Sequence, residues 1–592
     1  MTIKEYMTSI ANNIRSLLKS TEKMNLSSMS SNVEIIKNEI YTENNLIHRI
    51  YNALLRKIGI VDIEEIITTG TSSDLIIGKE MVDSDGNVVI GTMVPDNEIN
   101  NIIDSILNKT IVEYSDDKID YIGGVAFASC TSLTSVSFPA CTSIGPQAFY
   151  SCESLTSVSF PVCSYIGEEA FVYCENLTSV SFPVCTEINT YAFASCYSLA
   201  SVSFPVCTRI GQQAFVCCYS LTSVSFSACN YIGIAAFGEC TSLTIASFPV
   251  CSYIGDGAFY SCESLTSVSF PVCSYIGDGA FSSCYSLTSV SFPVCTRIGQ
   301  EAFAYCYSLT SVSFPACEYI DYGAFGECTS LTIASFPVCT YINSYAFPVC
   351  TSLTSVSFPV CNYIGEGAFG MCTSLTSASF PVCNYIGDSA FFSCTSLTSV
   401  SFPVCTRIGQ QAFVCCYSLT SVSFSACNYI GIAAFGGCYN LTTISFPVCE
   451  YIGDTAFDWC TSLTSVSFPV CNYIGEGAFG MCTSLTSASF PVCNYIGEGA
   501  FANCSNLTSV SLPECNYIGA GTFYECYSLT SLTLGASSVC TLDDITAFDS
   551  TPMSVSTYTG NYGSIYVPAS LVNAYKSATN WAMYSSRITA IV

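Results

Sequence analysis

The chain has 592 residues, half of them hydrophobic and only 10% charged, which is too apolar for a disordered protein. Ser and Pro interrupt every apolar run, so no membrane-spanning segment is predicted. The chain carries 44 acidic and 16 basic residues, and the part from about 125 to 540 holds only Arg209, Arg297 and Arg407, so nucleic-acid binding there is disfavoured.

The first 60 residues are predicted to form a helical region for oligomerisation or attachment. The chain starts without a basic patch followed by an apolar stretch, so no ordinary secretory signal is readable. Apolar residues recur at steps of three and four residues in two stretches of this region, and the second stretch predicts an amphipathic or short coiled-coil helix. The second stretch contains Ile36, Ile40, Ile47, Ile50, Leu54 and Ile58. Such helices could join copies of the chain into a homo-oligomer or pack on their own chain as a hairpin.

Residues 61–118 are predicted to be a small linker with a hairpin. Asp85-Gly86 stands between two apolar runs, and this dipeptide is favoured in two-residue turns between antiparallel strands.

A 22-residue repeat organises residues 119–548. One cysteine series runs from Cys130 to Cys526 and a second from Cys141 to Cys515, both in steps of 22. The unit contains L-x-x-V-x-F-x-x-C-x-x-I, which predicts a strand over Thr134–Phe138 and then a turn or a short 3₁₀ or α segment. One unit cannot bury its own apolar residues, so we expect about 19 stacked coils, a β-rich solenoid with one short parallel strand per coil.

The sequence Ile-Gly-x-x-Ala-Phe-x-x-Cys, followed by Ser-Leu-Thr-Ser-Val-Ser-Phe-Pro, resembles the BspA-type leucine-rich-repeat family over residues 119–592. The resemblance implies a C-terminal cap over 549–592, made of a strand, a helix and a closing strand. It also implies a cell-surface or secreted protein that acts in adhesion.

Residues 10–15 and 77–93 resemble segments found near the start of phage tail-fibre-like proteins. This second resemblance implies a place in a virion, which a protein reaches without a signal peptide. If neither resemblance indicates where the protein resides, the cytoplasm is the alternative location.

Catalysis is not predicted, and neither a catalytic residue nor a cofactor-binding residue is assigned. The chain has one histidine, His48, and lacks the phosphate-binding, nucleophile-elbow, zinc-protease and dinucleotide motifs. The forty cysteines form no C-x-x-C pair, and their two series belong to different edges of the coil, so no metal site is assigned. Disulfides along one series would disturb the equal spacing of the coils, and buried free thiols are favoured.

A row of tyrosines is the candidate ligand-binding surface. Tyrosine offers a flat apolar face and a polar tip, which suits a sugar ring or a protein partner. The alternative is that the tyrosines stack on one another as part of the solenoid wall. Arg209, Arg297 and Arg407 stand at the same repeat position, which indicates access to solvent. The row, two residues after the second cysteine of a unit, is Tyr165, Tyr231, Tyr253, Tyr275, Tyr319, Tyr341, Tyr363, Tyr385, Tyr429, Tyr451, Tyr473, Tyr495 and Tyr517.

Acidic residues follow the turn glycine in eight units. They could line a calcium-binding edge, but placement at the start of a short helical turn is favoured. They are Glu168, Asp256, Asp278, Glu366, Asp388, Asp454, Glu476 and Glu498.

Two functions are compatible with these observations. The first is a non-catalytic recognition or adhesion protein that binds a surface glycan or protein, as a cell-surface or phage tail component. The second is a structural spacer or fibre without a ligand of its own.

Overall fold

The computed structural model describes residues 109–554 and 562–591, and two short strands before them. These strands, β1 (Met81–Val82) and β2 (Val88–Val89), pair antiparallel in the segment for which a hairpin is predicted. The helices predicted for residues 1–60 lie outside the described residues. The chain divides into two compact units, Met1–Cys229 and Asn230–Val592, and both contain coils of the same kind.

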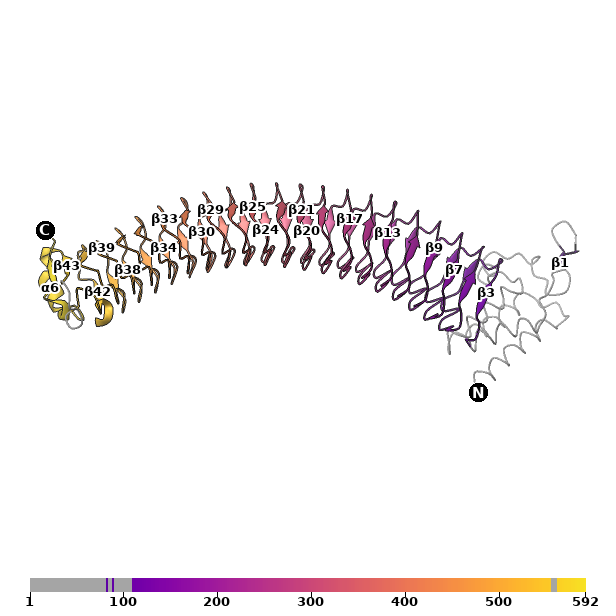
Figure 1. The fold of residues 1–592 in the computed structure, drawn as a ribbon, viewed down its shortest axis with the longest axis horizontal. Helices are drawn as coiled ribbons and strands as arrows, with labels where there is room; N and C mark the ends of the chain where they lie inside the picture. Colours follow the sequence, from indigo (N-terminus) through magenta and orange to yellow (C-terminus); the bar gives the residue numbers. More distant parts are fainter. Residues whose placement is uncertain (1–80, 83–87, 90–108, 555–561, 592) are drawn as a thin grey trace, which may run out of the picture. The chain divides into compact units, whose positions relative to one another are not determined.

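Each coil contributes one longer and one shorter strand (Figure 1). The first described coil has β3 (Glu113–Ser115) and β4 (Tyr121–Ile122). Each later odd-numbered or even-numbered strand begins 22 residues after the one before it in its series, as far as β39 (Ser509–Leu512) and β40 (Tyr517–Ile518). The predicted solenoid of 22-residue coils is confirmed, while the two-residue second strand is a feature that the sequence did not reveal.

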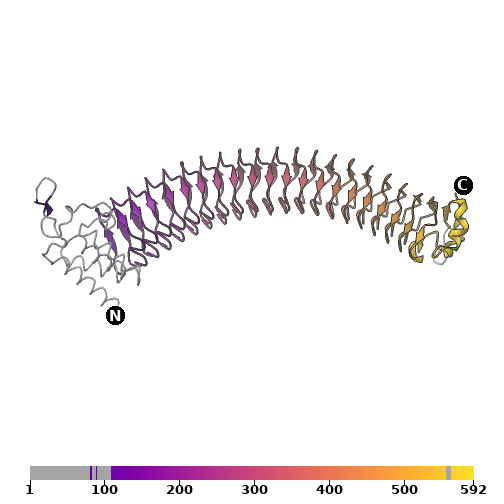
Figure 2. The same ribbon diagram turned by 180° about the vertical axis from the view of Figure 1, so that it is seen from behind.

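Strands of neighbouring coils lie side by side (Figure 2), and the paired strands are parallel and in register, so each paired residue lies beside its own copy. In the first unit, Ser135 of β5 (Ser135–Ser137) pairs with Ser157, and the even-numbered strands β4 to β12 pair from coil to coil. In the second unit, the even-numbered strands from β14 (Tyr231–Ile232) onward pair in the same way. The odd-numbered strands pair in separate, smaller sheets. The register keeps apolar residues facing inward on every coil.

The third side of the coil is a chain of turns, and we call the six residues before each first-series cysteine the turn segment. In the segment 476–481, Gly477 and Met481 have φ of 58° and 54°, which is left-handed backbone that a helix does not contain. The N–H groups of Gly477, Phe479 and Met481 donate to carbonyls of the next coil at 2.8, 2.8 and 2.9 Å. The sequence left open a turn or a short 3₁₀ or α segment on this side of the coil, and the structure has the turn.

The core is a set of ladders formed by like residues. In the coil that begins at Cys460, the side chains of Leu463, Phe468 and Ile474 are completely buried. Phe479 stacks on Phe457 of the preceding coil, with ring centroids 5.2 Å apart, and meets Phe468 edge-on at 6.1 Å. Stacked and edge-to-face pairs are the favoured aromatic arrangements, so the two phenylalanine ladders stabilise each other.

A small cap closes the second unit. The last coil has β41 (Ser531–Leu534), β42 (Thr541–Leu542) and a 3₁₀ turn, η1 (Ile545–Phe548). After it come β43 (Ser564–Val567), η2 (Ala569–Leu571), α6 (Val572–Ser577), η3 (Ala582–Tyr584) and β44 (Ile588–Ala590).

Strand β43 pairs with β41, and β44 pairs with β43. The indole N–H of buried Trp581 donates to the carbonyl of Cys540 at 2.7 Å. The cap therefore covers strand edge and apolar surface that the last coil would otherwise expose.

The turn glycine after the second strand is required by the close approach of two backbones. A Cβ atom at Gly387 would lie 2.5 Å from the carbonyl carbon of Gly365 in the preceding coil. Gly123, which stands at the same position in the first described coil, has no atom within 4 Å of such a Cβ.

We expect Gly387→Ala to lower the free energy of unfolding by roughly 1–3 kcal/mol, because two hydrogen-bonded coils must separate to admit the methyl group. The matched control Gly123→Ala, which has open space, should change it by less than about 0.5 kcal/mol. Denaturant unfolding of both variants measures the difference, and equal losses in the two variants would contradict the close-approach argument.

Candidate functional site

The tyrosine row lies on the second strand of the coil. Each tyrosine is the first residue of its strand, and the isoleucine that follows is buried, so the tyrosine side chain points outward. Tyr165 is 47% exposed, and the other twelve are half-buried. Strand pairing places the tyrosines of successive coils opposite one another, as Tyr451 lies opposite Tyr473. All thirteen predicted residues thus reach the surface.

The rings of neighbouring tyrosines stack face to face. Ring centroids lie 4.5 Å apart for Tyr341 and Tyr363 and 4.7 Å apart for Tyr451 and Tyr473, with nearly parallel planes. A stacked ring has most of its face covered, so the row offers ring edges and hydroxyls more than open faces. The tyrosines therefore stack on one another as part of the solenoid wall, and their polar tips remain accessible.

Two hydroxyls in the middle of the row have raised pKa values. Partial burial and the neighbouring phenol of Tyr363 raise the pKa of Tyr341 to about 12. Partial burial, together with Tyr451 and Tyr495, raises the pKa of Tyr473 to about 12 as well. Both therefore remain protonated at neutral pH and can donate and accept hydrogen bonds.

Arginines stand in the row at three of the five units that lack the tyrosine, and Ser143 and Glu187 stand at the other two. The Arg297 guanidinium lies over the ring of Tyr319, 5.2 Å from its centroid, and donates to Asp321 at 2.8 Å. The Arg407 guanidinium lies 4.3 Å from the centroid of Tyr429. Burial opposes ionisation of Asp321, but hydrogen bonds from Arg297, Asn343 and the Tyr322 N–H lower its pKa below the ordinary value. Cationic side chains thus take part in the stack.

The four aspartates among the acidic residues after the turn glycine bond to the next coil. The carboxylates of Asp256, Asp278 and Asp454 each accept the N–H of the residue 22 positions later, at 3.0, 2.8 and 2.9 Å. Asp388 does the same at 2.8 Å. These bonds give the aspartates a role between coils, at the start of a turn rather than of the predicted helical turn. Among the described residues, no three His, Cys, Asp or Glu side chains are grouped as metal ligands.

All forty cysteines are free thiols, and only Cys217 and Cys415 are partly exposed. First-series thiols donate to a phenylalanine carbonyl of the preceding coil, as Cys174 does to Phe149 at 3.2 Å. Second-series thiols donate to the carbonyl two residues ahead, as Cys163 does to Tyr165 at 3.2 Å. Cysteine therefore fills the core as a small hydrophobic residue and also satisfies a buried carbonyl.

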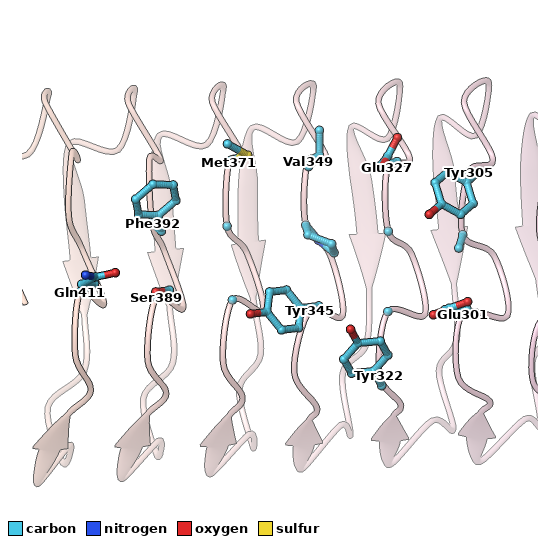
Figure 3. Close-up of a pocket in the computed structure, with 16 residues that line it drawn as sticks. Glu301, Tyr305, Tyr322, Glu327, Tyr345, Val349, Met371, Ser389, Phe392 and Gln411 are labelled. Atoms are coloured by element: carbon cyan, nitrogen blue, oxygen red, sulfur yellow. The ribbon is translucent and has the colours of Figure 1, made fainter.

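A groove runs along the turn segments of the second unit, on a different side of the coil from the tyrosine row (Figure 3). It has a volume of about 500 Å³. One wall contains Tyr305, Glu327, Val349 and Met371, and the other contains Glu301, Tyr322, Tyr345, Ser389 and Gln411. The lining also includes Gly323 and Gly367, which stand at the repeat position of Tyr345, and Gly326, Pro348 and Gly370, which stand three residues later in their turn segments.

This groove was not predicted from the sequence. Its lining residues stand at repeat positions that vary from unit to unit, so no ladder marks them. The available signal was the gathering of glycine at the second and fifth residues of nearby turn segments, at Gly323, Gly326, Gly367 and Gly370.

The coil, its parallel ladders and the L-x-x-V-x-F pattern define a leucine-rich-repeat solenoid. The chain belongs to the BspA-type leucine-rich-repeat family, whose model matches residues 106–221, 208–332, 340–448 and 428–554. The predicted family membership is thus confirmed. None of the curated proteins matches the chain. Members of this class generally act by binding.

Among solved structures, the chain is similar to a leucine-rich repeat protein from Bacteroides ovatus, at 24% identity and a TM-score of 0.34. That similarity covers 74% of this chain and 94% of that chain. It is also similar to a leucine rich cell surface protein from Faecalibacterium prausnitzii, at 19% identity and a TM-score of 0.24, over 77% of this chain and 93% of that chain.

Two features bear on catalysis and membranes. His48, the one histidine, lies outside the described residues. No helix among the described residues combines the length and apolarity needed to cross a membrane.

We expect a water-soluble thiol reagent to modify two thiols per native chain, because only Cys217 and Cys415 reach the surface. Denaturing the chain should raise the count to forty. A Cys217→Ser/Cys415→Ser double variant serves as the control and should not react while native. Rapid modification of many more thiols in the native chain would contradict the burial of the two series.

We expect the unfolding temperature to fall as pH rises above about 9. Burial raises the pKa of Cys185 and Cys251 from 9.0 to about 11, and that of Cys207 and Cys361 to about 12. Between the unfolded and folded pKa values only the unfolded chain loses thiol protons, so alkali favours unfolding, whereas below pH 9 the stabilisation is complete. Thermal unfolding under reducing conditions across this range measures the effect, and a constant unfolding temperature up to about pH 11 would be inconsistent with it.

Proposed function

We propose that this chain is a non-catalytic recognition protein that contacts a surface glycan or a surface protein through its tyrosine row. The observation that carries the proposal is the series of tyrosine hydroxyls and ring edges held at fixed spacing on paired strands. Contacts that are weak singly become strong when many act together on a repetitive target. Membership in the BspA-type family supports a binding role.

The serines of the longer strand widen this surface. In strands such as β35 (Ser465–Ser467), both serines are exposed and flank a buried valine. The neighbouring threonine hydroxyls bond to the preceding coil instead, as Thr376 does to the carbonyl of Thr354 at 2.9 Å. Serine and tyrosine hydroxyls are therefore the polar groups offered to a glycan, while threonine holds the coils together.

The protein would act at a cell surface or in a virion, attached through the region before residue 109. Homo-oligomerisation through the helices predicted in residues 1–60 would multiply the binding surfaces. Both the location and the oligomeric state belong to the proposal.

A structural spacer without a ligand is the second candidate. It is favoured by copying in whole units, since residues 201–238 recur letter for letter at 399–436 and residues 350–387 recur at 460–497. Such copying changes the number of coils without disturbing the register. A spacer and a recognition protein differ in whether the exposed row binds anything.

We expect the full chain to bind selectively on a glycan array or to whole cells, and Tyr451→Ala/Tyr473→Ala to weaken that binding about tenfold, or about 1.4 kcal/mol. The control is Tyr417→Ala/Tyr439→Ala, because these two tyrosines also stack, at 5.2 Å, but lie outside the row. Equal binding by both double variants would remove the tyrosine row as the contact surface. Absence of binding to every glycan and cell type would favour the spacer.

A further inference from the structure

The groove over the turn segments is open because nothing covers its floor. The nearest atoms to a Cβ at Gly370 would be backbone atoms of Gly367 in its own coil, at 3.3 Å or more. The nearest atoms to a Cβ at Gly326 would belong to Gly323 and Pro348, also at 3.3 Å or more. At Gly238, by contrast, the same position is covered, since a Cβ would lie 2.1 Å from the ring of Tyr260.

The copied segment makes the comparison sharper. Gly480 stands in the letter-for-letter copy of the segment that contains Gly370. There a Cβ atom would lie 2.8 Å from the carboxylate of Asp458, which belongs to the preceding coil. At Gly370 the preceding coil has Pro348 in that place. The open space at Gly370 therefore depends on the residue of the preceding coil and does not follow from the repeat.

The walls combine aromatic rings with carboxylates. Tyr322 and Tyr345 meet edge to face, with ring centroids 5.7 Å apart, and the Tyr345 hydroxyl donates to Glu366 at 2.5 Å. Glu301 and Glu327 line the groove itself. Aromatic rings and carboxylates together attract ammonium and guanidinium groups, the first through the negative ring face and the second through charge.

Among residues 230–540, no basic side chain lies on this side of the coil. Residues 230–540 contain 17 acidic residues and two basic ones, Arg297 and Arg407, and both arginines stand on the second strand in the tyrosine row. The acids of the groove are therefore not neutralised from within these coils. A positively charged ligand would supply the missing complement, and an anionic one would be repelled.

We propose that this groove binds an extended, basic peptide segment of a partner protein. The lining spans the turn segments of six coils, from Glu301 to Gln411. At about 4.8 Å per coil this corresponds to roughly 24 Å, which accommodates about seven residues of extended peptide. The length argues for a peptide over a small amine, and the exposed rings and carboxylates provide places for lysine or arginine side chains along it.

The test uses the full chain and a short fluorescein-labelled peptide of alternating Lys and Ala, with binding followed by fluorescence anisotropy. We expect saturable binding that weakens with added salt and is absent for the same peptide with Glu in place of Lys. Glu301→Gln/Glu327→Gln should weaken binding about tenfold. The control Glu169→Gln/Glu525→Gln removes two charges from the same repeat positions outside the groove and should change affinity less than about twofold.

A second pair of variants separates the groove from the general negative charge of the protein. Gly370→Phe fills the floor without changing charge, and Phe392 shows that the turn segment accepts a phenylalanine at this position. Its control is Gly480→Phe in the copied segment. We expect only Gly370→Phe to abolish binding. Failure of the native chain to bind the basic peptide, equal binding of the acidic peptide, or equal effects of each variant and its control would overturn the proposal.

Discussion

The structure depends on backbone hydrogen bonding between coils that are one repeat apart. Within each unit the shorter strands pair from coil to coil, and the longer strands pair in smaller groups of coils. N–H groups of the turn segment join the third side, as the Phe479 N–H does by donating to the Ala500 carbonyl. A shift by one residue would turn every inward side chain outward. The constant step of 22 residues is therefore a requirement of the fold.

This register forces every side chain to lie beside its copy, and the repeat sequence is suited to that condition. Phenyl rings stack on phenyl rings, while thiols fill the core and donate to backbone carbonyls. Carboxylates next to one another would repel, but Asp278 directs one oxygen to the N–H of Gln300 in the next coil. Glycine remains where two backbones approach too closely for any side chain.

Because the interior is fixed, functional variation is confined to the outward positions. The tyrosine row and the turn-side groove differ in how their residues vary along the array. The row has the same residue in most coils, and its stacked rings form a regular series that suits a repetitive target. The groove has residues that vary from coil to coil, since Gly326, Pro348 and Gly370 occur together only in neighbouring coils of this part of the array. One scaffold thus carries a regular surface and a local site.

The sequence by itself determined the repeat, the inward ladders such as Leu463 and Ile474, the outward placement of the tyrosines and the family. These features depend on residues within one unit, and each unit repeats the same surroundings. Only the tertiary structure decided that tyrosine faces are covered by neighbouring rings and that a groove exists. It also decided that the third side consists of turns that contain residues with positive φ. Gly370 and Gly480 have identical local sequences, yet only Gly370 has open space above it, because that space is set by a side chain of the preceding coil.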